Sequence, residues 1–207
     1  MLPADPLLPA PSIFTDSLGF TNVFYQKLIR HANEQGFQPE WLLALFCSES
    51  GLNPRAFNQN GGASGLSQIM PKTLYGLGWR GGNEDFESVG GIYRKLPPEN
   101  QIDWTAKYFD GWRRAFQLPS WSSRGQMYVA NFLPREVPHA KSPDYILCSN
   151  VGATRYIYVA NAGLDHVRKG NITVGDMEIA IANAVKSTER KYLAALGSLD
   201  RVRKVRS

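Results

Sequence analysis

One glutamate stands at the end of an apolar stretch and is followed at once by a polar loop. Glu49 comes directly after the apolar segment 41–47, and residues 51–65 then supply amides, hydroxyls and glycines. A carboxyl held against apolar surface stays protonated near neutral pH, and amides and hydroxyls beside it can hold a sugar. This combination is what cleavage of a glycosidic bond requires.

The position of Glu49 depends on the helix that carries it. Pro39 favours a helix start and Gly51 favours its end, so the sequence predicts a helix between them. Within it, Glu49 shares a core-facing stripe, at i, i+3, i+4 and i+7 spacing, with Leu42, Leu45 and Phe46. We therefore expect desolvation to raise the pKa of the Glu49 carboxyl.

The other expected elements are helices as well. Helical spacing predicts helices over 21–35, 102–116, 122–133 and 154–162, and a long one over 174–199 capped by Thr173 and Asp176. A short helical turn over 66–69 precedes another helix near Pro71, and the glycine-rich segment 76–91 is expected to be irregular. No segment alternates over six residues, so we predict a mainly α fold with few strands.

The chain is long enough for one core with an appendage. We expect an N-terminal arm over 1–19, a core over 20–135, a C-terminal helical extension packed on the core over 136–199 and a basic tail over 200–207. The two cysteines, Cys47 and Cys148, leave a disulfide open.

Composition narrows the classes of function. The chain has 207 residues, of which 43% are hydrophobic and 20% charged, as in ordinary globular proteins. It contains no apolar run near 18 residues and no basic start before an apolar segment, so we expect neither a membrane span nor a signal peptide. The net charge of +5 is compatible with an anionic polymer as partner or with a solvated surface. We expect no nucleic-acid partner, metal or cofactor, because no module or ligand spacing for them is present.

Residues 49–73 carry a resemblance to a known family. Glu49-Ser50, Asn53-Pro54, Ala63-Ser64-Gly65-Leu66, Gln68, Met70-Pro71 and Thr73 resemble the motif of lytic transglycosylases of the soluble-Slt type, relatives of goose-type lysozyme. Ser67 departs from the pattern, because family members have methionine there. The resemblance is clear over about 37–75, extends to about 133, and implies a lysozyme-like catalytic domain with extra C-terminal helices.

The resemblance also implies a reaction and its residues. Glu49 would be the single catalytic acid, cleaving the β-1,4 bond between N-acetylmuramic acid and N-acetylglucosamine in peptidoglycan glycan strands. The product would carry a 1,6-anhydromuramic acid end, without a cofactor. By position, Gln68 and Met70 would contact the sugars, with Asn58 and Ser64 as further candidates.

The family's Ala-Tyr-Asn-Ala-Gly segment, which supplies a tyrosine near the acid, has two partial counterparts here. Tyr128-Val129-Ala130-Asn131 has alanine at the tyrosine position, and Val159-Ala160-Asn161-Ala162-Gly163 has alanine there too. We favour Asn131, with Tyr128 as the aromatic substitute, and leave Asn161 open.

The later segments 131–134 and 161–176 resemble transglycosylase domains of bacteriophage virions. This implies a chain in a phage tail or among ejected proteins, acting in the host periplasm on the cell wall, with terminal arms that contact other virion proteins. Segment 164–173 resembles the end of a calcium loop, but His166, Arg168 and Lys169 replace its carboxylates, so we predict a turn.

Two alternatives stay open. A goose-type muramidase would need a second carboxylate to position water, and the candidates are Glu84, Asp85 and Glu87. A non-catalytic virion component would bind glycan through aromatic residues, for which the candidates are Trp79, Trp104, Trp112 and Trp121.

Overall fold

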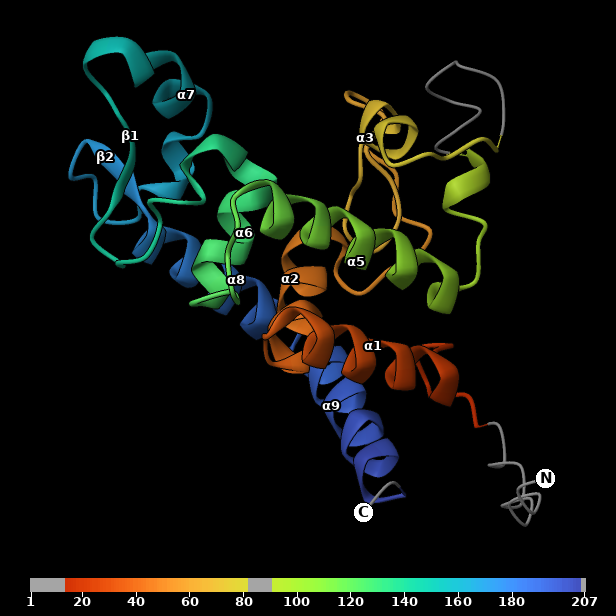
Figure 1. Cartoon of the computed structure of the whole chain (residues 1–207). Coiled ribbons are helices and arrows are strands. Elements are labelled where there is room, and N and C mark those ends of the chain that lie inside the picture. Colours follow the sequence, from red (N-terminus) through yellow and green to blue (C-terminus); the bar gives the residue numbers. More distant parts are fainter. Residues whose placement is uncertain (1–13, 82–90, 206–207) are drawn as a thin grey trace.

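The computed structural model of the chain describes residues 14–81 and 91–205 and is mainly helical, as predicted (Figure 1). Two short strands accompany the helices. The elements in chain order are α1 (Asn22–Gln35), α2 (Pro39–Ser50), α3 (Pro71–Gly76), α5 (Pro98–Ala115), α6 (Arg124–Phe132), η1 (Pro134–Glu136), β1 (Ile146–Ser149), η2 (Gly152–Thr154), α7 (Arg155–Ala160), η3 (Ala162–Leu164), β2 (Asn171–Thr173), α8 (Val174–Ser187) and α9 (Glu189–Lys204).

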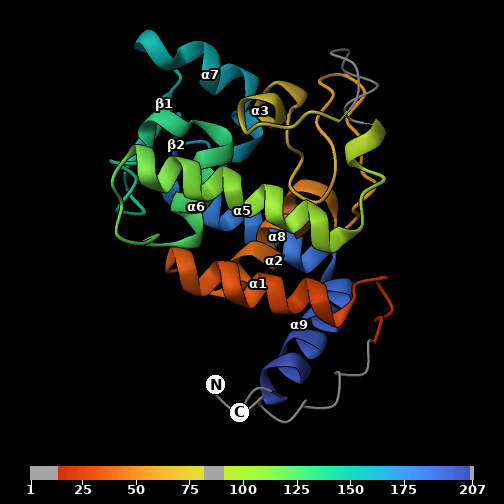
Figure 2. The same ribbon diagram turned by 45° about the vertical axis from the view of Figure 1, so that its right-hand side comes forward.

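The helix that carries Glu49 is the centre of the fold. Residues 42–47 of α2 are buried, and α1, α6, α8 and α9 pack against this helix (Figure 2). Its predicted ends are confirmed, because Pro39 occupies the first turn and Gly51 adopts the left-handed conformation at φ 60°. A glycine adopts this conformation without the steric cost that a Cβ would bring.

The main core lies around α2, and a second, smaller cluster lies beneath α3. The smaller cluster consists of Ile69, Leu74, Trp79 and Tyr93, with Trp104 packed against it. In Figure 1, α3 and α7 both lie above α6 and α2, α3 on the right and α7 on the left.

Three predicted helices differ from the structure. The helix predicted over 102–116 begins earlier, at Pro98, where proline again occupies the first turn. The helix predicted over 174–199 is two helices, because Thr188 interrupts it. The hydroxyls of Ser187 and Thr188 donate to the Ala184 carbonyl oxygen at 2.8 and 2.7 Å and so compete with the backbone for that acceptor.

The third difference lies in the 63–70 loop. Residues 65–68 form a turn that the bridge between Ser64 and Ile69 closes, and not the short helical turn predicted over 66–69. Gln68 has a φ of 48°, and one left-handed residue prevents a right-handed helical turn. The capping box predicted for Thr173 and Asp176 at the start of α8 is present.

The segment between α6 and α8 contains the antiparallel pair β1–β2, in which Cys148 is opposite Ile172. Asp165 organises the turn that resembles a calcium loop. Its carboxylate accepts hydrogen bonds from the backbone N–H groups of Lys169 and Gly170 at 3.0 and 2.7 Å. The side chain therefore serves the turn itself.

The predicted arm and tail are partly folded. Residues 1–13 lie outside the described residues, but Asp16 ties the following turn to α1 by accepting the Tyr25 hydroxyl at 2.5 Å. The basic tail expected from residue 200 is helical to Lys204, because Val202 is buried and Arg203 pairs with Glu40 at 2.5 Å.

Two further observations concern the cysteines and the possibility of a membrane-spanning helix. Cys47 and Cys148 are both buried free thiols. Over residues 14–81 and 91–205, no helix has the length and apolar character needed to cross a bilayer.

Candidate active site

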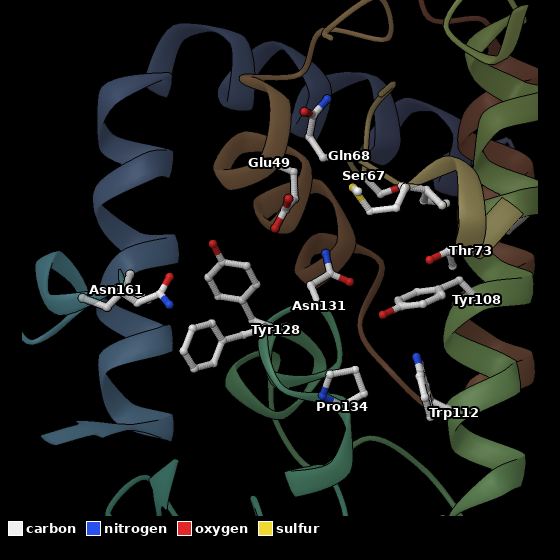
Figure 3. A pocket seen from close by; sticks show the side chains of 14 residues that line it. Glu49, Ser67, Gln68, Thr73, Tyr108, Trp112, Tyr128, Asn131, Pro134 and Asn161 are labelled. Atoms are coloured by element: carbon white, nitrogen blue, oxygen red, sulfur yellow. The ribbon is translucent and has the colours of Figure 1, made fainter. Parts of the chain in front are cut away.

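A pocket of about 550 Å³ lies at the C-terminal end of α2, and its size is typical of small-ligand sites (Figure 3). Its walls come from α2, the 63–70 loop, α3, α5, α6 and the turn after α7. The side chains that line it are Glu49, Ser67, Gln68, Ile69, Met70, Thr73, Tyr108, Trp112, Tyr128, Asn131, Phe132, Pro134, Asn161 and Leu164.

Glu49 is placed in this pocket by the last turn of α2. Burial raises the pKa of its carboxyl from an ordinary 4.5 to about 7, in the direction expected from its phase on the helix. A hydrogen bond from the Asn131 side chain acts in the opposite direction and favours the ionised form. The carboxyl is thus half protonated at about pH 7, which suits a group that must first give and then take a proton.

Two tyrosines flank the acid from different helices (Figure 3). Tyr128 of α6 accepts a hydrogen bond from the Ser48 hydroxyl at 3.1 Å, and Tyr108 of α5 donates to the Ala130 carbonyl oxygen at 2.6 Å. Burial raises the pKa of both phenols, and the negative charge of Glu49 raises each further. Both hydroxyls therefore stay protonated. The proton of Tyr108 is used in the bond to Ala130, whereas the Tyr128 hydroxyl accepts from Ser48 and keeps its own proton to donate.

The 63–70 loop forms the wall opposite α6, and hydrogen bonds of the Gln101 side chain hold this loop in place. The buried Gln101 side chain accepts from the Leu66 N–H at 3.0 Å and donates to the Pro54 carbonyl oxygen at 2.9 Å. Gln68, in its left-handed conformation, donates from its amide to the Gly65 carbonyl oxygen at 3.0 Å. Strained non-glycine residues of this kind gather at ligand sites.

The structure brings together most of the residues proposed from sequence. Gln68, Met70, Tyr128 and Asn131 line the pocket with Glu49. Asn58 and Ser64 do not line it.

The reason is local in both cases. Ser64 is fully buried between two backbone bridges, to Phe57 and Ile69. Asn58 is exposed and its side chain accepts the Asn60 N–H at 3.0 Å within its own turn.

Both alternatives for the amide position reach the pocket, on different sides. Asn131 bonds to Glu49, whereas Asn161 lies across the pocket and donates to the Ile157 carbonyl oxygen at 2.9 Å (Figure 3). Asn131 is thus the residue that acts directly on the acid.

Sequence reasoning missed Tyr108. Its i, i+4 relation to Trp112 on α5 places both on one face, and this spacing was the available signal. Of the four tryptophans considered for glycan binding, Trp112 alone lines this pocket within the described residues. Trp79 and Trp104 belong to the small cluster beneath α3, and Trp121 is buried in the main core.

Among the described residues that line the pocket, Glu49 is the one carboxylate. The candidate second acids Glu84, Asp85 and Glu87 lie outside the described residues.

The fold and the pocket together define a mainly helical protein with one acid of raised pKa beside amide, hydroxyl and aromatic groups. Residues 27–123, just under half of the chain, match the family model of the transglycosylase SLT domain. This match supports the lytic transglycosylase resemblance and a lysozyme-like helical fold over that part of the chain. None of the curated proteins matches the chain.

Proposed function

We propose that the protein is a lytic transglycosylase that cleaves peptidoglycan glycan strands with Glu49 as its single acid. The observation that supports this most is the Glu49 carboxyl, with a pKa of about 7, alone among amides, hydroxyls and aromatic rings in the described pocket lining. The match to the transglycosylase SLT domain supports the substrate class.

The first step is proton donation. Protonated Glu49 gives its proton to the oxygen that joins N-acetylmuramic acid to N-acetylglucosamine. The bond from C1 to that oxygen breaks, and its electron pair stays with the leaving sugar. Positive charge develops at C1, where the carbonyl oxygen of the 2-acetamido group stabilises it, so that a second protein carboxylate is dispensable.

The second step uses the carboxylate that the first has formed. Glu49, now ionised and bonded by Asn131, accepts the proton of the muramic 6-hydroxyl while that oxygen bonds to C1. The product is a 1,6-anhydro end, no water is consumed, and Glu49 is protonated again. A pKa of about 7 lets the same carboxyl act as the acid in the first step and as the base in the second near neutral pH.

Product analysis tests this function. Digested peptidoglycan examined by mass spectrometry should contain 1,6-anhydromuramic ends, and the Glu49→Gln variant should release none while it keeps a native circular dichroism spectrum. Reducing muramic ends would establish the hydrolytic muramidase in its place. Glycan binding without cleavage would establish the non-catalytic component.

We also propose that the chain is carried in a bacteriophage particle and acts in the host periplasm. Residues 1–19 and 200–207 would contact other virion proteins. The resemblance of segments 131–134 and 161–176 to virion transglycosylases supports this. Mass spectrometry of purified particles of the encoding phage should detect the chain, and its absence from them would exclude this setting.

A further inference from the structure

The end of the helix that carries the acid is held by a segment far away in sequence. Lys191, in the first turn of α9, donates from its ammonium to the Gly51 carbonyl oxygen at 2.9 Å. Gly51 caps α2 and stands two residues after Glu49. Lys191 also lies well beyond residues 27–123, which match the family model.

The contact brings a positive charge to the C-terminal end of α2, which has none of its own. A helix leaves its last carbonyl oxygens without intrahelical partners and carries partial negative charge at this end. The last turn of α2 contains no basic residue. The amides of Gly51 and Leu52 already bond to the carbonyl oxygens of Cys47 and Phe46. Lys191 adds from another helix a donor to the Gly51 oxygen and the cation that this terminus lacks.

The break between α8 and α9 at Thr188 lies against the same end of α2 that Lys191 contacts. Thr188 ends α8, and its methyl group would lie 3.7 Å from a Cβ at Gly51. Its side chain also hydrogen-bonds to the buried thiol of Cys47, one turn before the cap.

We infer that Lys191 is a positioning residue, which holds the last turn of α2 so that the Glu49 carboxyl keeps its place in the pocket. The inference rests on the proposed function of Glu49. Proton transfer is sensitive to such placement, because a displacement of about 1 Å can lower a rate by roughly a hundredfold. Loss of a contact from an exposed side chain has a smaller effect than a direct displacement. We expect it to lower kcat by about threefold to tenfold.

The test compares Lys191→Met with Lys191→Arg and with Arg190→Met, a neighbouring exposed cation of the same turn. We expect the methionine variant at position 191 to lower kcat for peptidoglycan without changing KM. The arginine variant should restore most of kcat, and Arg190→Met should behave as wild type. Hydrogen exchange of the Gly51 and Leu52 amides, which bond to the end of α2, should be faster in Lys191→Met alone.

The outcomes separate this inference from the proposed function. If the wild-type chain cleaves no peptidoglycan, the proposed function fails, and the inference that rests on it falls with it. If the wild type is active, an unchanged kcat in Lys191→Met overturns the positioning role, whatever the exchange rates. A lower kcat without faster exchange also overturns it, because the effect would then not act through the end of α2.

Discussion

The side-chain amide of Asn131, at the end of α6, hydrogen-bonds to the carboxyl of Glu49 at the end of α2 and lowers its pKa. The bond favours the ionised form, whereas burial favours the protonated form and has the larger effect on the pKa. The two helices thus set the proton affinity of the acid between them.

Replacing Asn131 by leucine should move the activity profile to higher pH. Without the amide donor, the pKa of Glu49 rises above about 7, so the acid remains protonated to higher pH, and kcat falls because the carboxylate formed in the first step is less stabilised. The measurement is kcat/KM from about pH 5 to about pH 9, a range that brackets the pKa of Glu49. Asn161→Ala is the control, since Asn161 bonds to Ile157 across the pocket. A profile that moves in the control and not in Asn131→Leu would contradict this assignment.

The Glu49→Gln variant should be more stable than the wild type at alkaline pH. Folding raises the pKa of Glu49 from 4.5 to about 7, so its protonated form contributes stability below pH 4.5 that is lost as the pH rises to about 7. The difference amounts to about 3 kcal/mol at most, and glutamine does not titrate. Urea unfolding of both chains at pH 4.5 and 8 checks this. A constant stability difference between the two pH values would mean that Glu49 is not desolvated.

Some of this site was readable from sequence because it is local. The phase of Glu49 within α2 and the order Gln68, Met70 along one loop are short-range patterns, and the structure places all three at one pocket. Pro39 and Gly51 likewise predicted the two ends of α2 correctly.

The remaining features depend on tertiary contacts. Tyr108 faces the pocket because α5 packs beside α6. The apolar stripe of α5 indicates which residues face the core, but not which residues beside the stripe line a pocket. Ser64 looked like a groove hydroxyl but is buried by its bridges to Phe57 and Ile69. The break at Thr188 arises from hydroxyl competition for one carbonyl oxygen, in a segment whose apolar spacing continues through it.

Tyr108→Phe should destabilise the fold more than Tyr128→Phe. Tyr108 donates to the carbonyl oxygen of Ala130, in the last turn of α6, where backbone acceptors have no intrahelical partner. Its loss leaves that oxygen unpaired at a cost of about 1–3 kcal/mol. Tyr128 accepts from Ser48, whose hydroxyl can turn to water. Urea unfolding of the two variants compares them, and an equal loss would show that the Ala130 oxygen is hydrated in the variant.

Gly65→Ala should disable the 63–70 loop, and this is the sharpest test of how that wall of the pocket is built. Gly65 has a φ of 75°, and a Cβ there would lie 2.6 Å from both Gln101 Oε1 and Tyr93 Cε1. The left-handed conformation alone costs about 1 kcal/mol with a side chain. The clash adds to this, because Gln101 is fixed by its bonds to Leu66 and Pro54 and cannot withdraw.

The effect should reach activity through Gln68, whose amide bonds to the Gly65 carbonyl oxygen. We expect kcat/KM to fall further than the fraction of folded protein does. Gly111→Ala is the matched control: Gly111 lies inside α5, a Cβ there meets nothing within 4 Å, and alanine should stabilise the helix by about 0.5–1 kcal/mol. Thermal unfolding and peptidoglycan turnover are measured on both variants. Wild-type turnover in Gly65→Ala would show that the loop adapts and that the position of Gln68 does not limit the reaction.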